Sequence, residues 1–181
     1  MVLDCVAYGK AGHAARNEGV NAIYKAMESI NWFQSYEFDK NSELLGPVKM
    51  TVTMIKAGQQ HNVIPDTCEF VVDIRVNECY SNEQVYLIVK DNAGCEVNPR
   101  SFRLGSSRIQ LNHPLVRRGL DLSIPYYGSP TMSDQVFMTF PSLKMGPGDS
   151  ARSHTANEYI YEEEIFNAIE TYCELLQNLC L

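Results

Sequence analysis

The order of strand-like and helix-like segments over residues 1–106 constrains the fold more than any other feature of the sequence. Four segments alternate apolar and polar residues with the two-residue period of a β-strand, and two segments between them place apolar residues at helical spacing. We predict strands at residues 1–8, 48–58, 67–76 and 95–104, and helices at residues 17–33 and 81–94. This βαββαβ order predicts an α+β, ferredoxin-like domain with a four-stranded antiparallel sheet and two helices on one face.

Local signals set several of these bounds. Asn17 and Glu18 are candidate caps of the first helix, while Ser81 and Gly94 are the candidate start and stop of the second. Pro99 interrupts the last strand, which is therefore predicted to lie at an edge of the sheet. One face of such a sheet stays open, and its edges can pair with another chain.

The pattern changes at about residue 107. We predict helices at 113–122 and 161–179, a loop entering a short helix at 126–137, and a short strand at 141–148 that ends at glycine. The last helix has glutamates 162–164 at its positive N-terminal end and carries a single apolar stripe. Two helices make a poor independent core. We therefore expect residues 107–181 to be part of a larger domain whose sheet lies elsewhere, in a chain that is truncated.

Composition excludes several classes of partner. With 45% hydrophobic and 20% charged residues, the chain has the composition of a globular protein. Its net charge of −7 argues against nucleic acid or an anionic membrane as a partner. No apolar run approaches the roughly 20 residues that cross a bilayer, and the N-terminus lacks the features of a signal peptide. The six cysteines include no CxxC pair, so we expect reduced, buried thiols in a cytoplasmic protein.

His13 is a candidate catalytic residue. It lies in GKAGHAAR, between Gly9 and the first predicted helix. One interpretation is a solvated histidine in a turn. The other is that Gly9 and Gly12 let the backbone bend tightly and present the imidazole, which can donate a hydrogen bond to a developing oxyanion.

The segment GPGDSARSHTANEYI, residues 146–160, allows three interpretations. It can be a plain loop, a phosphate-binding turn, or a loop that presents His154 to a metal ion. The phosphate interpretation is the weakest, because no GxxxxGK[ST] or GxGxxG pattern is present and Pro147 removes a backbone donor. His113, which precedes Pro114, is predicted to start a helix.

Asn62 and Arg75 flank the turn at Pro65 and the third strand. They are either a turn amide and a surface arginine, or a pair that grips a substrate carboxylate, a role suited to the forked guanidinium group.

Four segments occur in an ordered set: GKAGHAAR, QQHNVIPDTCEFVVDIRV, GSPTMSDQVF and GPGDSARSHTANEYI. Together they resemble the acetylornithine deacetylase and succinyl-diaminopimelate desuccinylase family of di-zinc hydrolases, which are relatives of aminoacylases and carboxypeptidases. The resemblance is closest to acetylornithine deacetylase and covers essentially all 181 residues.

The resemblance implies a role for each candidate residue. Residues 1–106 would be the family's lid, or dimerisation domain, and residues 107–181 the C-terminal part of the catalytic domain. His13 would reach into the partner subunit's site and steady the oxyanion, and His154 would be the last zinc ligand. The implied substrate-binding residues are Asn62, Arg75, Thr131, Ser133 and Gly146.

The sequence also departs from the family pattern. The N-terminal part of the catalytic domain, with its HxD motif, bridging aspartate and Glu-Glu pair, is absent from the chain. In the family those residues bring the other ligands of two zinc ions, which cobalt can replace, and the general base. Glutamates 162–164 follow His154 and cap a helix, so they do not replace them. We therefore expect this chain alone to retain no zinc.

The resulting hypothesis is part of a zinc-dependent amidohydrolase that removes the N-acyl group of an amino acid such as N-acetylornithine, in arginine biosynthesis. The implied partners are a small N-acyl amino acid and a second copy of the chain, joined through the lid. The chain alone is predicted to be inactive. Two alternatives stay open: a metal-free dimerisation or interaction module, and one half of a split enzyme.

Overall fold

The computed structural model describes residues 1–129, 131, 133–138 and 140–179, and it divides the chain into two compact units. The first unit comprises Met1–Ser106 with Gly128–Phe137, and the second comprises Ser107–Tyr127 with Met138–Leu181. Each unit is described in turn.

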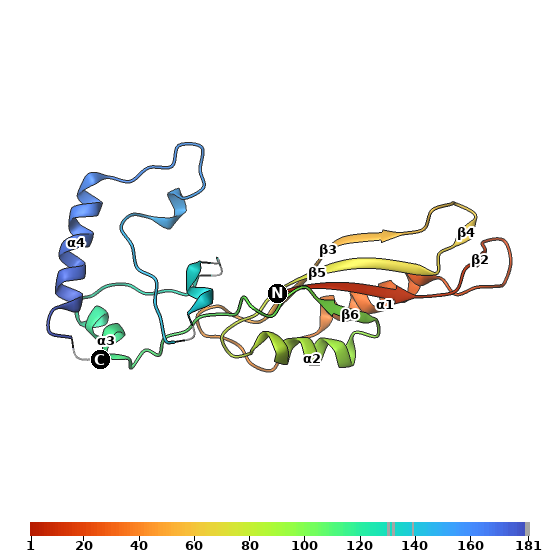
Figure 1. The fold of residues 1–181 in the computed structure, drawn as a ribbon, viewed down its shortest axis with the longest axis horizontal. Helices are drawn as coiled ribbons and strands as arrows, with labels where there is room; N and C mark the ends of the chain where they lie inside the picture. Colours follow the sequence, from red (N-terminus) through yellow and green to blue (C-terminus); the bar gives the residue numbers. More distant parts are fainter. Residues whose placement is uncertain (130, 132, 139, 180–181) are drawn as a thin grey trace. The chain divides into compact units, whose positions relative to one another are not determined.

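The first unit is built on a four-stranded antiparallel sheet with the order β3-β5-β1-β6 (Figure 1). Its strands are β1 (Val2–Tyr8), β3 (Lys49–Ala57), β5 (Thr67–Arg75) and β6 (Glu96–Pro99). The helices α1 (Ala22–Ser35) and α2 (Asn82–Asn92) supply the two crossovers. The predicted ferredoxin-like fold is confirmed, including the edge position of the strand that contains Pro99.

The core lies between one face of this sheet and the two helices. Strand periodicity turns Leu3 and Cys5 of β1, and Phe70 and Val72 of β5, toward the helices, where each is at most 2% exposed. The Phe33 ring of α1 meets the Phe70 ring edge to face at 6.0 Å between centroids. The core therefore joins β1, β5 and α1 directly.

Capping residues fix where the two helices begin. Asn21 caps α1 by accepting a hydrogen bond from the Ile23 N–H, and Ser81 forms a capping box with Gln84 at the start of α2. The prediction for Ser81 is confirmed, but the prediction that Asn17 and Glu18 cap the first helix is wrong. Val20 exchanges two backbone hydrogen bonds with Lys10, which holds the chain before Asn21 in an extended form.

A short ribbon extends the first unit beyond the end of the main sheet. It pairs β2 (Gly12–His13) with β4 (Val63–Ile64) in antiparallel register (Figure 1). Sequence periodicity misses these strands, since two residues are too few to show alternation.

The second unit contains α3 (Pro114–Asp121), α4 (Glu162–Leu176) and a 3₁₀ turn, η2 (Ser150–Arg152). Another 3₁₀ turn, η1 (Asp134–Phe137), belongs to the first unit. His113 caps α3 as predicted, through its Nδ1. The strand predicted at 141–148 is wrong: the structure places none of these residues in a strand. Strands need a partner, and the described part of this unit provides none.

Helix α4 leaves most of its apolar stripe uncovered. Of the predicted stripe only Leu175 is buried, and the side chain of Arg118 in α3 donates to the Glu174 carbonyl beside it. Ile169 is 54% exposed and Leu176 58% exposed. The glutamates 162–164 do lie in the first turn, as predicted.

In the described residues, no helix combines the length and the apolar character required to cross a lipid bilayer.

Replacing Phe70 with alanine is expected to lower the free energy of unfolding of the first unit by about 3–5 kcal/mol, because its ring fills the junction of β5 and α1. Denaturant unfolding followed by the fluorescence of Trp32, which packs against this core, measures the loss. Leu87→Ala is the control: Leu87 is 55% exposed on α2, and the change should be within about 0.5 kcal/mol. Equal losses in the two variants would contradict the core described here.

Candidate functional site

The β2–β4 ribbon presents His13 with one defined tautomer. The imidazole is exposed, and its Nδ1 accepts a hydrogen bond from the Ala15 N–H at 3.1 Å. A nitrogen that accepts cannot carry the proton, so the neutral ring is protonated at Nε2. His13 therefore turns an N–H donor toward whatever approaches the tip of the ribbon.

Close backbone approach explains the glycines around His13. A Cβ at Gly9 would lie 2.1 Å from the Val20 carbonyl oxygen, and a Cβ at Gly12 would lie 2.7 Å from that of Glu18. The His13 N–H also donates to the Glu18 carboxylate at 3.3 Å. The loop is thus folded tightly on itself, and its contacts fix the backbone of His13.

Asn62 lies beside His13. The Ala14 N–H donates to the Asn62 carbonyl at 3.0 Å, and His13 pairs with Val63 in the ribbon. The side chain of Asn62 is exposed. The structure therefore brings two residues from separate sequence segments to the same tip.

Arg75 lies at the opposite end of the sheet. It is the last residue of β5, and its Nε and Nη2 both contact one oxygen of Asp73, at 2.9 and 2.8 Å. Strand β5 has nine residues, so Arg75 lies about 26 Å along the strand from Thr67, the end that follows the ribbon. Within one chain Asn62 and Arg75 do not form the predicted carboxylate-gripping pair.

Thr131 and Ser133 belong to the first unit, next to η1. The Thr131 Oγ1 lies 2.7 Å from the Ser129 Oγ, and the Ser133 carbonyl accepts from the Val136 N–H at 3.1 Å. Gly146 lies in the second unit, and a Cβ there would have no heavy atom within 4 Å. The local backbone therefore does not require glycine at 146. The substrate-binding roles of these residues stay predictions.

His154 adopts a left-handed backbone conformation, with φ of 59°. Its N–H donates to the Glu158 carboxylate at 3.1 Å, and the Thr155 hydroxyl donates to the Arg152 carbonyl at 2.8 Å. Non-glycine residues in this region are uncommon and gather at functional sites. The imidazole of His154 is exposed, and its role as a metal ligand stays a prediction.

A cation–π cluster anchors the His154 loop to α4. The Arg152 guanidinium lies 5.0 Å from the Tyr159 ring centroid and 5.4 Å from that of Tyr161. Both of its terminal nitrogens donate to the Glu164 carboxylate, which also accepts from the Tyr161 N–H. The Arg152 guanidinium lowers the pKa of Glu164, with the Tyr161 N–H contributing. From the sequence, Glu164 is predicted only as a charge at the start of a helix, and its ion pair with Arg152 is not predicted. The segment contains the arginine and both tyrosines, but only the fold shows that they converge.

The described residues do not form a metal centre by themselves. Within residues 1–129, 131, 133–138 and 140–179, no three His, Cys, Asp or Glu side chains are placed to hold one ion. His154 fits a single ligand position, and a zinc site needs at least three from protein.

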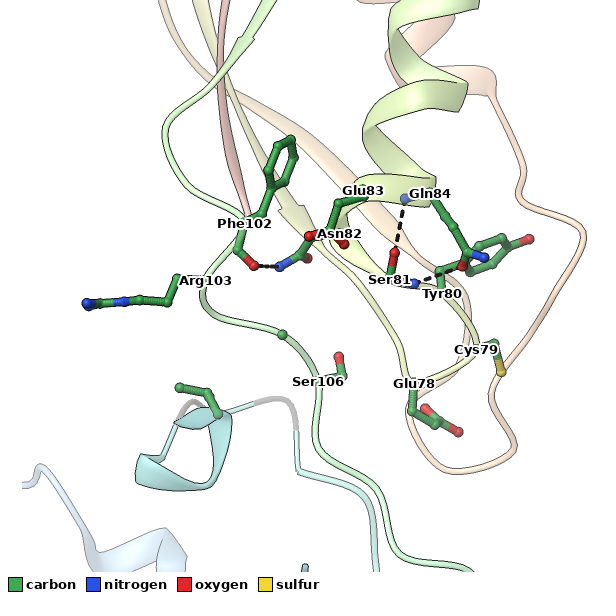
Figure 2. Close-up of a pocket in the computed structure, with 12 residues that line it drawn as sticks. Glu78, Cys79, Tyr80, Ser81, Asn82, Glu83, Gln84, Phe102, Arg103 and Ser106 are labelled. Carbon is green, nitrogen blue, oxygen red and sulfur yellow. Dashed lines mark hydrogen bonds between the residues drawn. The ribbon is translucent and has the colours of Figure 1, made fainter. Parts of the chain in front are cut away.

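A pocket of about 470 Å³ opens at the start of α2 (Figure 2). Asn82 donates to the carbonyls of Phe102 and Leu104, at 3.0 and 2.8 Å, and Ser81 and Gln84 are engaged in the capping box. None of the predicted site residues, all of which the structure describes, lines this pocket. Its polar groups fix the start of α2 and the segment after β6.

Comparison with known families finds a match for most of the first unit. Residues 2–93 match the peptidase dimerisation domain of the M20 family, over half of the chain. The chain belongs to the M20 peptidase family. The resemblance inferred from the sequence is thereby confirmed at the level of the M20 family, and residues 2–93 are what matches its dimerisation domain.

Individual M20 relatives match over nearly the full chain. A succinyl-diaminopimelate desuccinylase of Orientia tsutsugamushi is 26% identical, over 98% of this chain and 48% of the relative. A [LysW]-lysine/[LysW]-ornithine hydrolase of Sulfurisphaera tokodaii is 24% identical, over 99% of this chain and 53% of the relative. The crystal structure of aminopeptidase PepT from Bacillus cereus superposes with a TM-score of 0.65 at 21% identity, covering 97% of this chain and 50% of that one. The chain thus spans about half the length of the M20 relatives it matches.

These similarities support a hydrolase by family without selecting the acyl group. The closer resemblance to acetylornithine deacetylase stays a prediction.

Replacing Glu164 with glutamine should loosen the His154 loop, because it removes the charge that holds Arg152. We expect amide hydrogen exchange over residues 149–161 to accelerate about 1.5- to 5-fold at pH 7, the range that a partly exposed ion pair supports. Glu163→Gln, which makes the same charge change one residue earlier, should leave this exchange unchanged.

The faster amide hydrogen exchange expected for Glu164→Gln has a defined pH dependence. The pKa of Glu164 is lowered in the folded chain, so its contribution is complete above the ordinary value of 4.5 and is lost as the pH falls through the lowered pKa. The difference between Glu164→Gln and the unchanged chain should therefore vanish at acid pH. A difference that persists there would contradict the ion-pair explanation.

Proposed function

We propose that this chain is part of a cytoplasmic, zinc-dependent amidohydrolase that removes the N-acyl group of an amino acid, with N-acetylornithine as the substrate and arginine biosynthesis as the setting. The observation that carries the proposal is the hydrogen bond from the Ala15 N–H to His13 Nδ1, which leaves Nε2 as the N–H donor of an exposed imidazole. The names of the M20 relatives, which include a desuccinylase and a hydrolase of amino-acid conjugates, support the reaction class.

His13 would act on the substrate's acyl carbonyl. When an amide carbon is attacked, negative charge develops on the carbonyl oxygen, and a preorganised N–H donor stabilises that charge. The Ala15 N–H and the Glu18 carboxylate hold the histidine in place before substrate arrives. Asn62, beside it, would contact the same substrate.

The distance along β5 between Asn62 and Arg75 supports a site shared by two chains. A small N-acyl amino acid cannot contact both Asn62 and Arg75 of one chain, because β5 separates them by about 26 Å. If both contact one substrate molecule, they come from different subunits. We therefore propose a homodimer in which the ribbon of one subunit faces the Arg75 end of its partner.

The exposed edge of the sheet is the proposed dimer contact. Strand β3 is an edge strand, and a register shift between Val52 and Met54 interrupts its pairing with β5. On this edge Met54 is 65% exposed and Ile55 57% exposed, while Tyr24 of the adjoining helix α1 is 67% exposed. An unpaired strand edge with large apolar side chains is a surface that association would bury.

His154 would supply one ligand to the zinc, or to cobalt in its place. Because no three His, Cys, Asp or Glu side chains of the described residues are grouped to hold an ion, this chain alone is proposed to hold no metal and to lack activity. When bound, the metal would polarise the amide carbonyl.

A metal-free dimerisation module is the second candidate function. The match of residues 2–93 to the peptidase dimerisation domain favours it.

Metal content, hydrolysis and size, measured together on the purified chain with zinc or cobalt added, test the proposal. Substrates are N-acetylornithine and N-succinyl-diaminopimelate. We expect a dimer that retains no metal and turns over neither substrate. Activity that returns when the N-terminal half of an M20 relative is added would support a split enzyme. About two metals per chain together with turnover would contradict the proposed lack of a complete site.

Replacing Ile55 with aspartate should weaken the dimer roughly tenfold or more, because it places a charge on the proposed contact. Sedimentation equilibrium measures the dissociation constant. Leu87→Asp is the matched control, since Leu87 is similarly exposed but lies on α2. If both variants stay dimeric, the contact lies elsewhere.

A further inference from the structure

Two free cysteines meet in the core of the first unit. Cys5 lies in β1 and is 1% exposed, and Cys95, just before β6, is half-buried against the same core. Cys5 pairs with Val97 across the β1–β6 ladder, so Cys95 lies two residues from the position directly opposite. Residues two apart share a face of a sheet, so the side chains of Cys5 and Cys95 lie on the same face, in the same core.

Helix α1 contributes small residues to the same core. Ala22 and Ala26 are fully buried beneath it, and the Ser29 hydroxyl, on a residue that is 3% exposed, contacts Cys95. A Cβ at Gly94 would lie 3.9 Å from the Ser29 Oγ.

The two thiols differ in acidity. The pKa of Cys95 is lowered, chiefly by the hydrogen bond that the Cys5 thiol donates to its sulfur. The pKa of Cys5 is raised by the same contact with Cys95 and by burial. Cys95 thus ionises first, and its thiolate lies against a protonated thiol.

We propose that Cys5 and Cys95 are a modification site: a redox pair that a hydroperoxide converts into an intramolecular disulfide joining β1 to the residue before β6. This inference is independent of the hydrolase function.

The oxidation proceeds in two steps. The Cys95 thiolate attacks one oxygen of hydrogen peroxide, the O–O bond breaks, and a sulfenic acid and hydroxide form. The hydroxide takes up the proton that Cys95 had released and becomes water. Cys5 then attacks the Cys95 sulfur, an S–S bond forms, and the S–O bond breaks. The leaving oxygen departs as water with the Cys5 proton. Two thiols are oxidised and one peroxide is reduced to two waters, and a dithiol reverses the change.

The neighbouring cysteine on the other side of β1 provides a matched control. Cys68 of β5 pairs with Ala7, so it also stands diagonally from Cys5. It is fully buried, and burial raises its pKa. A pairing decided by proximity alone would make Cys68 a competitor of Cys95.

Treatment of the folded chain with hydrogen peroxide, followed by alkylation and peptide mass mapping, tests the proposal. We expect a Cys5–Cys95 linked peptide, lighter by two hydrogen atoms and restored by dithiothreitol. Cys68→Ser should leave its yield unchanged, and Cys95→Ser should abolish it. The oxidised chain should melt several degrees higher, since the cross-link constrains the unfolded state.

The unchanged chain alone decides the outcome if a variant fails to fold. A Cys5–Cys68 link, or a sulfinic acid at Cys95 with Cys5 still free, would overturn the proposal. So would the absence of any Cys5–Cys95 link after the exposed Cys173 is fully oxidised.

Discussion

Strand β5 is the element on which the rest of the first unit depends. It pairs with β1 on one side and β3 on the other, and it buries Cys68, Phe70, Val72 and Ile74 on one face. The chain enters it from the ribbon at its start and leaves it at Arg75. Its pairing thereby fixes both the core and the separation between the two groups of predicted site residues.

Much of this architecture follows from the sequence because it depends on long periodic segments. The alternation in β1, β3 and β5 and the apolar spacing of α1 and α2 are visible without coordinates, and so is the cap at Ser81. The start of α1 and the β2–β4 ribbon are not visible in this way. The start of α1 depends on the pairing of Val20 with Lys10, and the ribbon depends on the pairing of Ile64 with Gly12, and neither pairing has a periodic signal. The strand expected at 141–148 is wrong for a related reason: its residues alternate, but the described part of the second unit offers no strand for it to pair with.

The candidate site follows the same division. The sequence picks out His13 and His154 as unusual, and the structure adds the physical reasons: a hydrogen bond that fixes the tautomer of one, and a left-handed backbone held by Arg152 and Glu158 around the other. Spacing alone suggests that Asn62 and Arg75 act as a pair. That suggestion fails within one chain, because thirteen positions along the sequence include nine of extended strand.

The same strand acts as a spacer of fixed increments. Removing one residue from β5 would turn its buried face to solvent, so the fold tolerates length changes only in pairs, each moving the ribbon by about 7 Å relative to Arg75. The distance between the ribbon and Arg75 therefore cannot change in smaller steps while β5 keeps its buried face. Accommodation of longer or shorter ligands would then fall to the loop that carries His13 and to the side chains at either end.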